Sequence, residues 1–123
     1  MRILLVEDNL LNQKVVGFYL NKFDYTLVYA TNLREVMEEL QKETPDLILM
    51  DIMLPDKDGF DITKEIRDLE QRVGRKDEIP IVALTANTLD NDKEKCLQAG
   101  MNGYLSKPFS PEELIAVIKQ FTK

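Results

Sequence analysis

Residues 46–59 read "DLILMDIMLPDKDG", and this stretch places one carboxylate between two apolar runs. Leu47–Met50 form the first run, and Asp51 follows it directly. A short continuous apolar run is typical of a strand in a parallel sheet, because such a strand is buried on both faces. Asp51 is therefore expected at the rim of the sheet, with its backbone anchored in the core and its carboxylate facing a crevice.

The same alternation of apolar runs and helical patterns extends over the whole chain. Further runs occupy residues 3–6, 27–30, 81–84 and 104–105. Between the runs, apolar residues recur at the three- and four-residue spacing of amphipathic helices. These sets are Leu11, Val15, Phe18 and Tyr19; Leu33, Val36, Met37 and Leu40; Ile62, Ile66, Leu69 and Val73; a stretch at 88–99; and Leu114, Val117, Ile118 and Phe121. Five β–α units predict a doubly wound α/β fold with one parallel sheet.

Several residues are predicted to mark helix ends. Asn9 is suited to cap the first helix, and Thr31 or Asn32 the second. Ser110-Pro111-Glu112-Glu113 forms a capping box with proline at the first helical position. Gly100 is expected to end the helix at 88–99.

Composition limits the classes of function. A chain of 123 residues, 44% hydrophobic and 31% charged, predicts one globular domain over residues 1–123. The net charge of −6 argues against direct nucleic-acid binding. Cys96 is the only cysteine and histidine is absent, which excludes a disulfide within the chain and histidine-based catalysis or metal binding. No apolar run suits membrane insertion and no signal peptide is recognisable, so a cytoplasmic location is predicted.

Polar side chains follow four of the five predicted strands. They are Glu7 with Asp8, then Asp51, Thr85 and Lys107. A polar residue at one strand end is ordinary, because strand ends commonly meet solvent. However, the carboxyl ends of parallel strands form one ligand-binding crevice, and neighbouring strands lie about 4.8 Å apart. These five side chains are therefore expected to share a pocket.

The chemistry of this set favours a phosphoryl group. Three clustered acids repel one another unless a cation joins them, and carboxylate oxygens suit Mg²⁺. Lys107 would complete the neutralisation, leaving a place for a tetrahedral anion. A carboxylate such as that of Asp51 can act as a nucleophile and form an aspartyl phosphate.

Four motifs in order resemble the receiver domain of two-component response regulators. They are "ILLVEDN" (3–9), "LILMDIMLPDKDGF" (47–60), "PIVALTANT" (80–88) and "AGMNGYLSKPF" (99–109). The resemblance implies a flavodoxin-like single domain with strand order 2-1-3-4-5 and five helices. The stretches around "VEDNLLNQKV" and "ALTANT" look like receivers of hybrid histidine kinases or single-domain relay regulators.

The resemblance also implies residue roles at the acidic site. Asp51 would be the phosphoacceptor, and Glu7 and Asp8 would help to hold Mg²⁺. Met53 would lend its backbone carbonyl to the metal. Such a domain takes its phosphoryl group from a histidine kinase or a histidine phosphotransfer protein. It catalyses its own phosphorylation and dephosphorylation, and it is not an enzyme acting on an external metabolite.

Further implied roles concern switching. Thr85 and Lys107 would contact the phosphoryl oxygens, and Tyr104 would turn inward as Thr85 moves. The Lys107–Pro108 bond would be cis. The helix at 88–99, the strand around Tyr104 and the last helix would form the surface that binds a downstream protein. The helix at 88–99 has few apolar anchors, so it is expected either to shift cheaply or simply to be well solvated.

Other assignments compete with this one. Residues 54–65 resemble a calcium-binding EF-hand loop, but Leu54 stands at the first ligand position and a strand precedes it. A haloacid-dehalogenase phosphatase would carry an acid where Met53 stands, and nucleotide-binding glycine motifs are absent. Cys96 lacks partners for a redox or metal role and is expected to be a buried apolar residue. An alternative function is that of a pseudo-receiver, which signals by docking alone. The chain is expected to be either a free-standing regulator or a part of a hybrid kinase.

Overall fold

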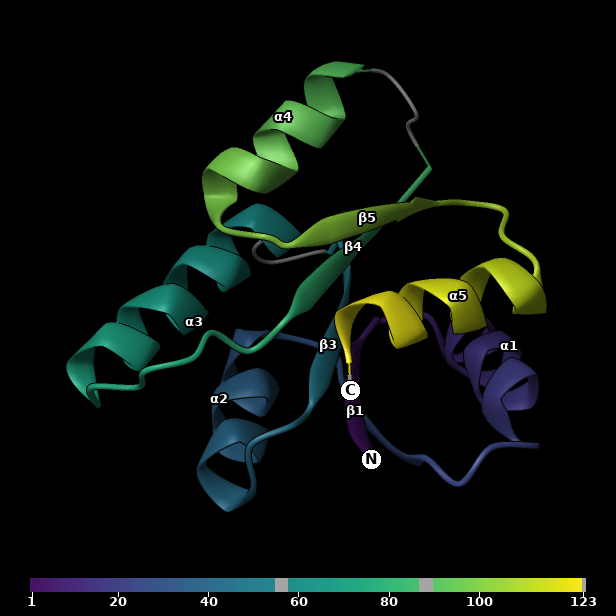
Figure 1. Cartoon of the computed structure of the whole chain (residues 1–123), viewed down its shortest axis with the longest axis horizontal. Helices are drawn as coiled ribbons and strands as arrows, with labels where there is room; N and C mark the ends of the chain where they lie inside the picture. The colour runs from purple at the N-terminus through teal and green to yellow at the C-terminus, as the bar shows by residue number, and fades with distance from the viewer. Residues whose placement is uncertain (55–57, 87–89, 123) are drawn as a thin grey trace.

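The computed structural model describes residues 1–54, 58–86 and 90–122, with a five-stranded parallel sheet between two layers of helices (Figure 1). The strands are β1 (Arg2–Val6), β2 (Thr26–Ala30), β3 (Leu47–Asp51), β4 (Ile81–Thr85) and β5 (Gly103–Ser106). The helices are α1 (Leu10–Leu20), α2 (Leu33–Lys42), α3 (Gly59–Arg72), α4 (Asp90–Ala99) and α5 (Pro111–Phe121). The element order confirms the predicted β–α alternation.

The strand order is β2-β1-β3-β4-β5, as the resemblance implied. Strand β1 pairs with β2 on one side and with β3 on the other. After β2 the chain therefore crosses back over β1, and the later strands are added on the opposite side of β1. In doubly wound folds, ligands bind outside the carboxyl ends of the strands at this switch point. The topology therefore places a crevice beyond Val6 of β1 and Asp51 of β3.

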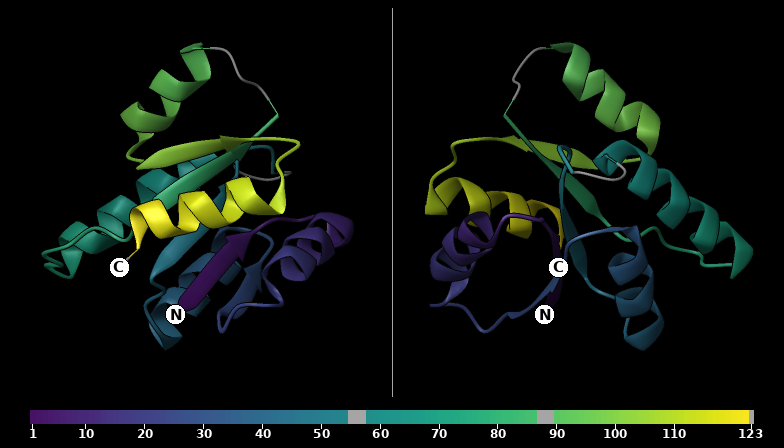
Figure 2. Two further views of the ribbon diagram at one scale, coloured as in Figure 1. Left: turned by 45° about the vertical axis from the view of Figure 1, so that its right-hand side comes forward. Right: turned by 180° about the vertical axis from the view of Figure 1, so that it is seen from behind.

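Helices cover both faces of the sheet (Figure 2). Successive side chains of a strand point to opposite faces, so each strand contributes to two cores. Leu4 and Val6 of β1 pack in the core that includes residues of α2, α3 and α4. Ile3 and Leu5 pack in the second core, with residues of α1 and α5. Both faces are apolar because both are covered, which explains the continuous apolar runs.

The predicted caps are confirmed. The side chain of Asn9 accepts a hydrogen bond from the backbone of α1, and that of Asn32 does so for α2. Ser110 and Glu113 form the reciprocal capping box of α5. Gly100 has a φ of +102°, a conformation that suits glycine, directly after α4. These local signals set the helix boundaries.

The apolar set that predicted α1 is not its buried face. Leu11 is 69% exposed and Phe18 is 72% exposed, so these residues mark the helix as predicted but do not pack into the core. The α1 side chains that are buried are Gln13, Val16 and Leu20. The helix carries apolar residues on nearly every side, so its periodicity does not select one face.

Two smaller expectations concern the end of α3 and the extent of α4. Val73 is exposed and caps the end of α3 instead of packing as part of its apolar stripe. Helix α4 begins at Asp90, while positions 88 and 89 of the predicted helix lie outside the described residues. Leu97 is exposed, whereas Cys96 is buried as expected. Across the described ranges, no helix combines the length and apolar character that crossing a bilayer requires.

Candidate functional site

Three carboxylates meet at the switch point of the sheet. Glu7 and Asp8 follow β1 directly, and Asp51 is the last residue of β3. Strands β1 and β3 are paired, with Val6 opposite Met50, so their carboxyl ends lie side by side. One carboxylate oxygen from each of the three acids lies within 4.8 Å of the others. The expected convergence of these acids is confirmed.

The acids differ in exposure. Asp51 is only 6% exposed and Glu7 is also buried, whereas Asp8 is exposed to solvent. Backbone amides hold the cluster, since the Asp8 N–H donates to Glu7 Oε2 at 3.1 Å. The Met53 N–H donates to Asp51 Oδ1 at 3.2 Å. The cluster is therefore fixed at its inner side and open at Asp8, where an ion can enter.

Lys107 brings a positive charge to the same point. Its Nζ lies 3.4 Å from Asp51 Oδ1 and 3.8 Å from Glu7 Oε1. The predicted cis bond between Lys107 and Pro108 is confirmed. The Lys107 backbone N–H donates to the carbonyl of Thr85 at 2.7 Å. Thr85 is buried at the end of β4, the strand beside β3, so all five predicted polar residues lie at the same edge of the sheet.

Burial changes the acidity of Glu7. Desolvation raises the pKa of Glu7 from its ordinary value of 4.5 to about 7. The value of about 7 also includes smaller contributions: hydrogen bonding to Asp51 and the charge of Asp51 raise this pKa, while a hydrogen bond from the Asn12 side chain and the charge of Lys107 lower it. The acidic cluster therefore holds a proton on Glu7 below neutral pH when no cation is bound.

This shift predicts a pH-dependent stability. Between pH 4.5 and about 7, folded Glu7 keeps a proton that the unfolded chain has released. The free energy of unfolding should therefore fall as pH rises through this window, by on the order of 1–3 kcal/mol. Denaturant unfolding in a chelating buffer at pH 5 and pH 8 measures the change. Glu7→Gln should remove most of this slope, and the exposed Glu112→Gln should keep it; equal slopes in both variants would contradict the assignment.

The donor set fits Mg²⁺. Three carboxylates are hard oxygen ligands, and Mg²⁺ is usually bound by one or two carboxylates while it keeps several waters. The exposed side of the cluster at Asp8 leaves room for those waters. A bound divalent cation would favour the charged form of Glu7 and so oppose the desolvation and the Asp51 charge that raise its pKa. Binding of Mg²⁺ should therefore weaken as pH falls below about 7.

Other predicted residues lie outside the crevice or are only partly described. The side chain of Met53 is exposed, and the role of its carbonyl stays a prediction. The Tyr104 side chain is 38% exposed, with Lys93 Nζ 5.9 Å from the ring centroid. In the EF-hand-like stretch, Asp58 caps α3 instead, and residues 55–57 are outside the described part.

Gly59 packs closely against the backbone of Asp51. A Cβ at this position would lie 2.6 Å from the Asp51 carbonyl oxygen, so only glycine fits there without a shift of the backbone.

Two residues at this site were not predicted. The Gln13 side-chain amide donates to the Glu7 carbonyl at 2.7 Å, and Asn12 hydrogen-bonds the Glu7 carboxyl group. Gln13 shares the buried face of α1 with Val16 and Leu20. In the sequence, the signal for Gln13 is its helical spacing from Val16 and Leu20, which places a polar side chain on the same face as two apolar ones.

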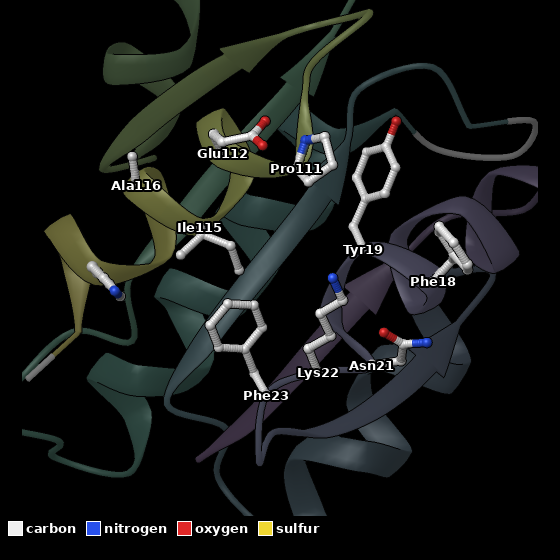
Figure 3. A pocket seen from close by; sticks show the side chains of 10 residues that line it. Phe18, Tyr19, Asn21, Lys22, Phe23, Pro111, Glu112, Ile115 and Ala116 are labelled. Carbon is white, nitrogen blue, oxygen red and sulfur yellow. The ribbon is translucent and has the colours of Figure 1, made fainter.

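A groove of about 620 Å³ lies between α1 and α5, away from the acids (Figure 3). Tyr19, Phe23 and Ile115 border it from its two sides (Figure 3). Lys22 and Lys119 also line the groove. Together with the exposed Leu11 and Phe18, these residues make the α1 side of the molecule apolar with a basic border.

The doubly wound sheet, the three acids at its switch point and the lysine beside them match the arrangement that the receiver motifs implied. The chain belongs to the response regulator receiver domain family, whose sequence profile matches residues 3–119. It is a receiver domain of two-component systems, as the motifs indicated.

Individual relatives support this assignment. Hybrid signal transduction histidine kinase K of Dictyostelium discoideum is 39% identical over 122 residues, which cover 97% of this chain and 10% of that protein. This chain spans no more than 10% of the length of three such kinases. The receiver domain of sensor histidine kinase PA1611 from Pseudomonas aeruginosa is 43% identical, with a TM-score of 0.83 and coverage of 98% and 95% of the two chains. That structure has a magnesium ion coordinated in its active site cleft.

A third relative was solved with a partner. The receiver domain of Ssk1 from Saccharomyces cerevisiae, in complex with the histidine phosphotransfer protein Ypd1, matches with 35% identity and a TM-score of 0.88. The match covers 99% of this chain and 88% of the other. The family therefore includes receivers of hybrid kinases and receivers that bind phosphotransfer proteins.

Proposed function

We propose that this receiver takes a phosphoryl group from a phosphohistidine onto Asp51 in a Mg²⁺-dependent reaction. The observation that carries the proposal is the convergence of Glu7, Asp8 and Asp51 within 4.8 Å, with Lys107 Nζ 3.4 Å from Asp51. Magnesium would be held by the three acids and the Met53 carbonyl, and would neutralise charge on the phosphoryl oxygens.

The residues of the chain then have separate roles. Asp51 attacks phosphorus, so a carboxylate O–P bond forms while the P–N bond to the donor imidazole breaks. Lys107 pairs with one phosphoryl oxygen and Thr85 donates a hydrogen bond to another. Water later hydrolyses the acyl phosphate, so the chain promotes its own dephosphorylation and turns over no external metabolite. The added charge draws Thr85 and Lys107 inward and shifts a two-state equilibrium.

A small phosphodonor tests the proposal without any partner protein. With Mg²⁺, the chain should gain one acid-labile phosphoryl group per molecule, and with a chelator it should gain almost none. A pseudo-receiver would show neither labelling nor a response of tyrosine fluorescence to Mg²⁺. A phosphatase would release phosphate from phosphomonoesters in large excess over the protein concentration.

The donor is a histidine kinase or a histidine phosphotransfer protein, and we place its docking surface on α1. A protein that brings a phosphohistidine to Asp51 must cover the crevice, and α1 begins beside that crevice at Leu10. The exposed Leu11 and Phe18 offer that protein an apolar contact. The downstream protein binds the α4–β5–α5 surface, and both steps take place in the cytoplasm. The chain acts either alone or within a hybrid kinase.

Substitutions on the two proposed surfaces should impair different steps. Tyr104→Ala should weaken binding of the phosphorylated chain to its downstream protein and leave the rate of labelling by a small phosphodonor unchanged. Phe18→Ser should slow phosphotransfer from a protein donor by about 10-fold, because truncating an interface anchor costs 1–2 kcal/mol. It should leave labelling by a small phosphodonor unchanged. Radiolabel incorporation from both donors measures phosphotransfer, and a binding assay with the phosphorylated chain measures the contact with the downstream protein. Loss of small-donor labelling in either variant would refute the separation.

A further inference from the structure

Helix α1 buries a polar side chain and exposes apolar ones. Gln13 is 9% exposed, whereas Leu11 and Phe18 on the same helix face solvent. An uncharged amide on the sheet side of a helix requires hydrogen-bond partners, because a buried polar group without them destabilises the fold. The partner that Gln13 reaches is a residue of the acidic cluster.

The backbone of Glu7 is held from two directions. Its N–H donates to the carbonyl of Ala30, the last residue of β2, at 2.9 Å. Its carbonyl accepts from the Gln13 side-chain amide of α1 at 2.7 Å, and this contact is buried. Glu7 has left the strand pairing of β1, which ends at Val6. Gln13 therefore supplies a hydrogen bond to this carbonyl that the sheet ladder no longer provides.

The same turn of α1 also reaches the carboxyl group. Asn12 hydrogen-bonds the Glu7 side chain, and the Asp8 N–H donates to Glu7 Oε2. The corner between β1 and α1 therefore carries two of the three clustered acids, and the first turns of α1 fix its geometry. Some residues hydrogen-bond a metal ligand and orient it without binding the metal. Replacing such a residue commonly lowers metal affinity 10- to 100-fold.

We propose that Gln13 is a positioning residue of the Mg²⁺ site, which sets the backbone at Glu7 and thereby the direction of the Glu7 and Asp8 carboxylates. This inference rests on the proposed function, because it assigns a role toward the cation that the acids bind. In this role the Gln13 side chain is not itself a ligand of the cation or of the phosphoryl group. It acts through the 2.7 Å hydrogen bond to the Glu7 carbonyl.

The test compares Mg²⁺ affinity with stability in three variants of the full chain. Gln13→Met keeps the size of the side chain but removes the donor, and Gln13→Ala leaves room for a water if the first variant folds poorly. Leu20→Ala is the control, because Leu20 is buried on the same helix and packs away from the acids. Isothermal titration calorimetry gives the affinity, and thermal unfolding without divalent cations gives the stability.

We expect about 10-fold weaker Mg²⁺ binding in both Gln13 variants and wild-type affinity in Leu20→Ala, even if all three lower the melting temperature. Labelling by a small phosphodonor should slow at low Mg²⁺ and recover at saturating Mg²⁺. Affinity within two-fold of wild type in the Gln13 variants, or an equal loss in Leu20→Ala, would show a purely structural role and overturn the inference. Absence of Mg²⁺ binding by the unaltered chain would instead overturn the proposed function as well.

Discussion

Replacing Asp51 with asparagine is expected to reduce acid-labile phosphate incorporation by more than about 100-fold. Asparagine keeps the shape and can still accept the hydrogen bond from Met53 N–H. Its neutral amide oxygen, however, is a poor nucleophile toward phosphorus. Incorporation is measured with a labelled small phosphodonor at saturating Mg²⁺, followed by acid and base treatment.

The control for this substitution is Asp68→Asn, which alters an exposed carboxylate of α3. It should label at the wild-type rate, because Asp68 lies outside the acidic cluster. If Asp51→Asn gained acid-labile phosphate at a rate comparable with Asp68→Asn, the acceptor would be another residue.

Lys107→Met should slow phosphorylation by about 10²- to 10³-fold while it preserves or strengthens Mg²⁺ binding. The ammonium lies 3.4 Å from Asp51 and 3.8 Å from Glu7, so it competes with a divalent cation for the same carboxylates. Two unit charges about 4 Å apart interact by on the order of 4 kcal/mol at an effective dielectric of about 20. Removing the ammonium takes away a charge that the transferring phosphoryl group needs.

The two effects must be measured on one preparation. Calorimetric titration gives the Mg²⁺ affinity, and single-turnover labelling at saturating Mg²⁺ gives the rate. Lys119→Met, on the exposed side of α5, should change neither quantity. Parallel loss of affinity and rate in Lys107→Met would mean that the lysine merely supports the fold of the site.

The position of the acids could be predicted from sequence because one rule governs it. Every strand of a parallel sheet covered on both faces is a short apolar run, and all such strands end at the same edge. Glu7, Asp51 and Lys107 each follow such a run, so their convergence required only the order of the strands. The helix caps could also be predicted, because capping depends on residues within one turn.

The orientation of α1 could not be predicted in the same way. Its apolar residues surround the helix, and the face that packs is chosen by the sheet instead of the periodicity. The role of Gln13 could not be predicted, because its partner, the Glu7 carbonyl, is a backbone atom that no sequence pattern identifies. The raised pKa of Glu7 likewise depends on burial and on the charge of Asp51, which only the packed structure specifies.

The most direct test of the central claim is to locate the phosphoryl group on the unaltered chain by peptide mass spectrometry after treatment with a small phosphodonor. The account predicts one phosphoryl group on Asp51, which forms in the presence of Mg²⁺ and does not form when a chelator replaces Mg²⁺ during the treatment. A phosphoryl group on any other residue, or equal labelling of Asp51 without a divalent cation, would contradict it.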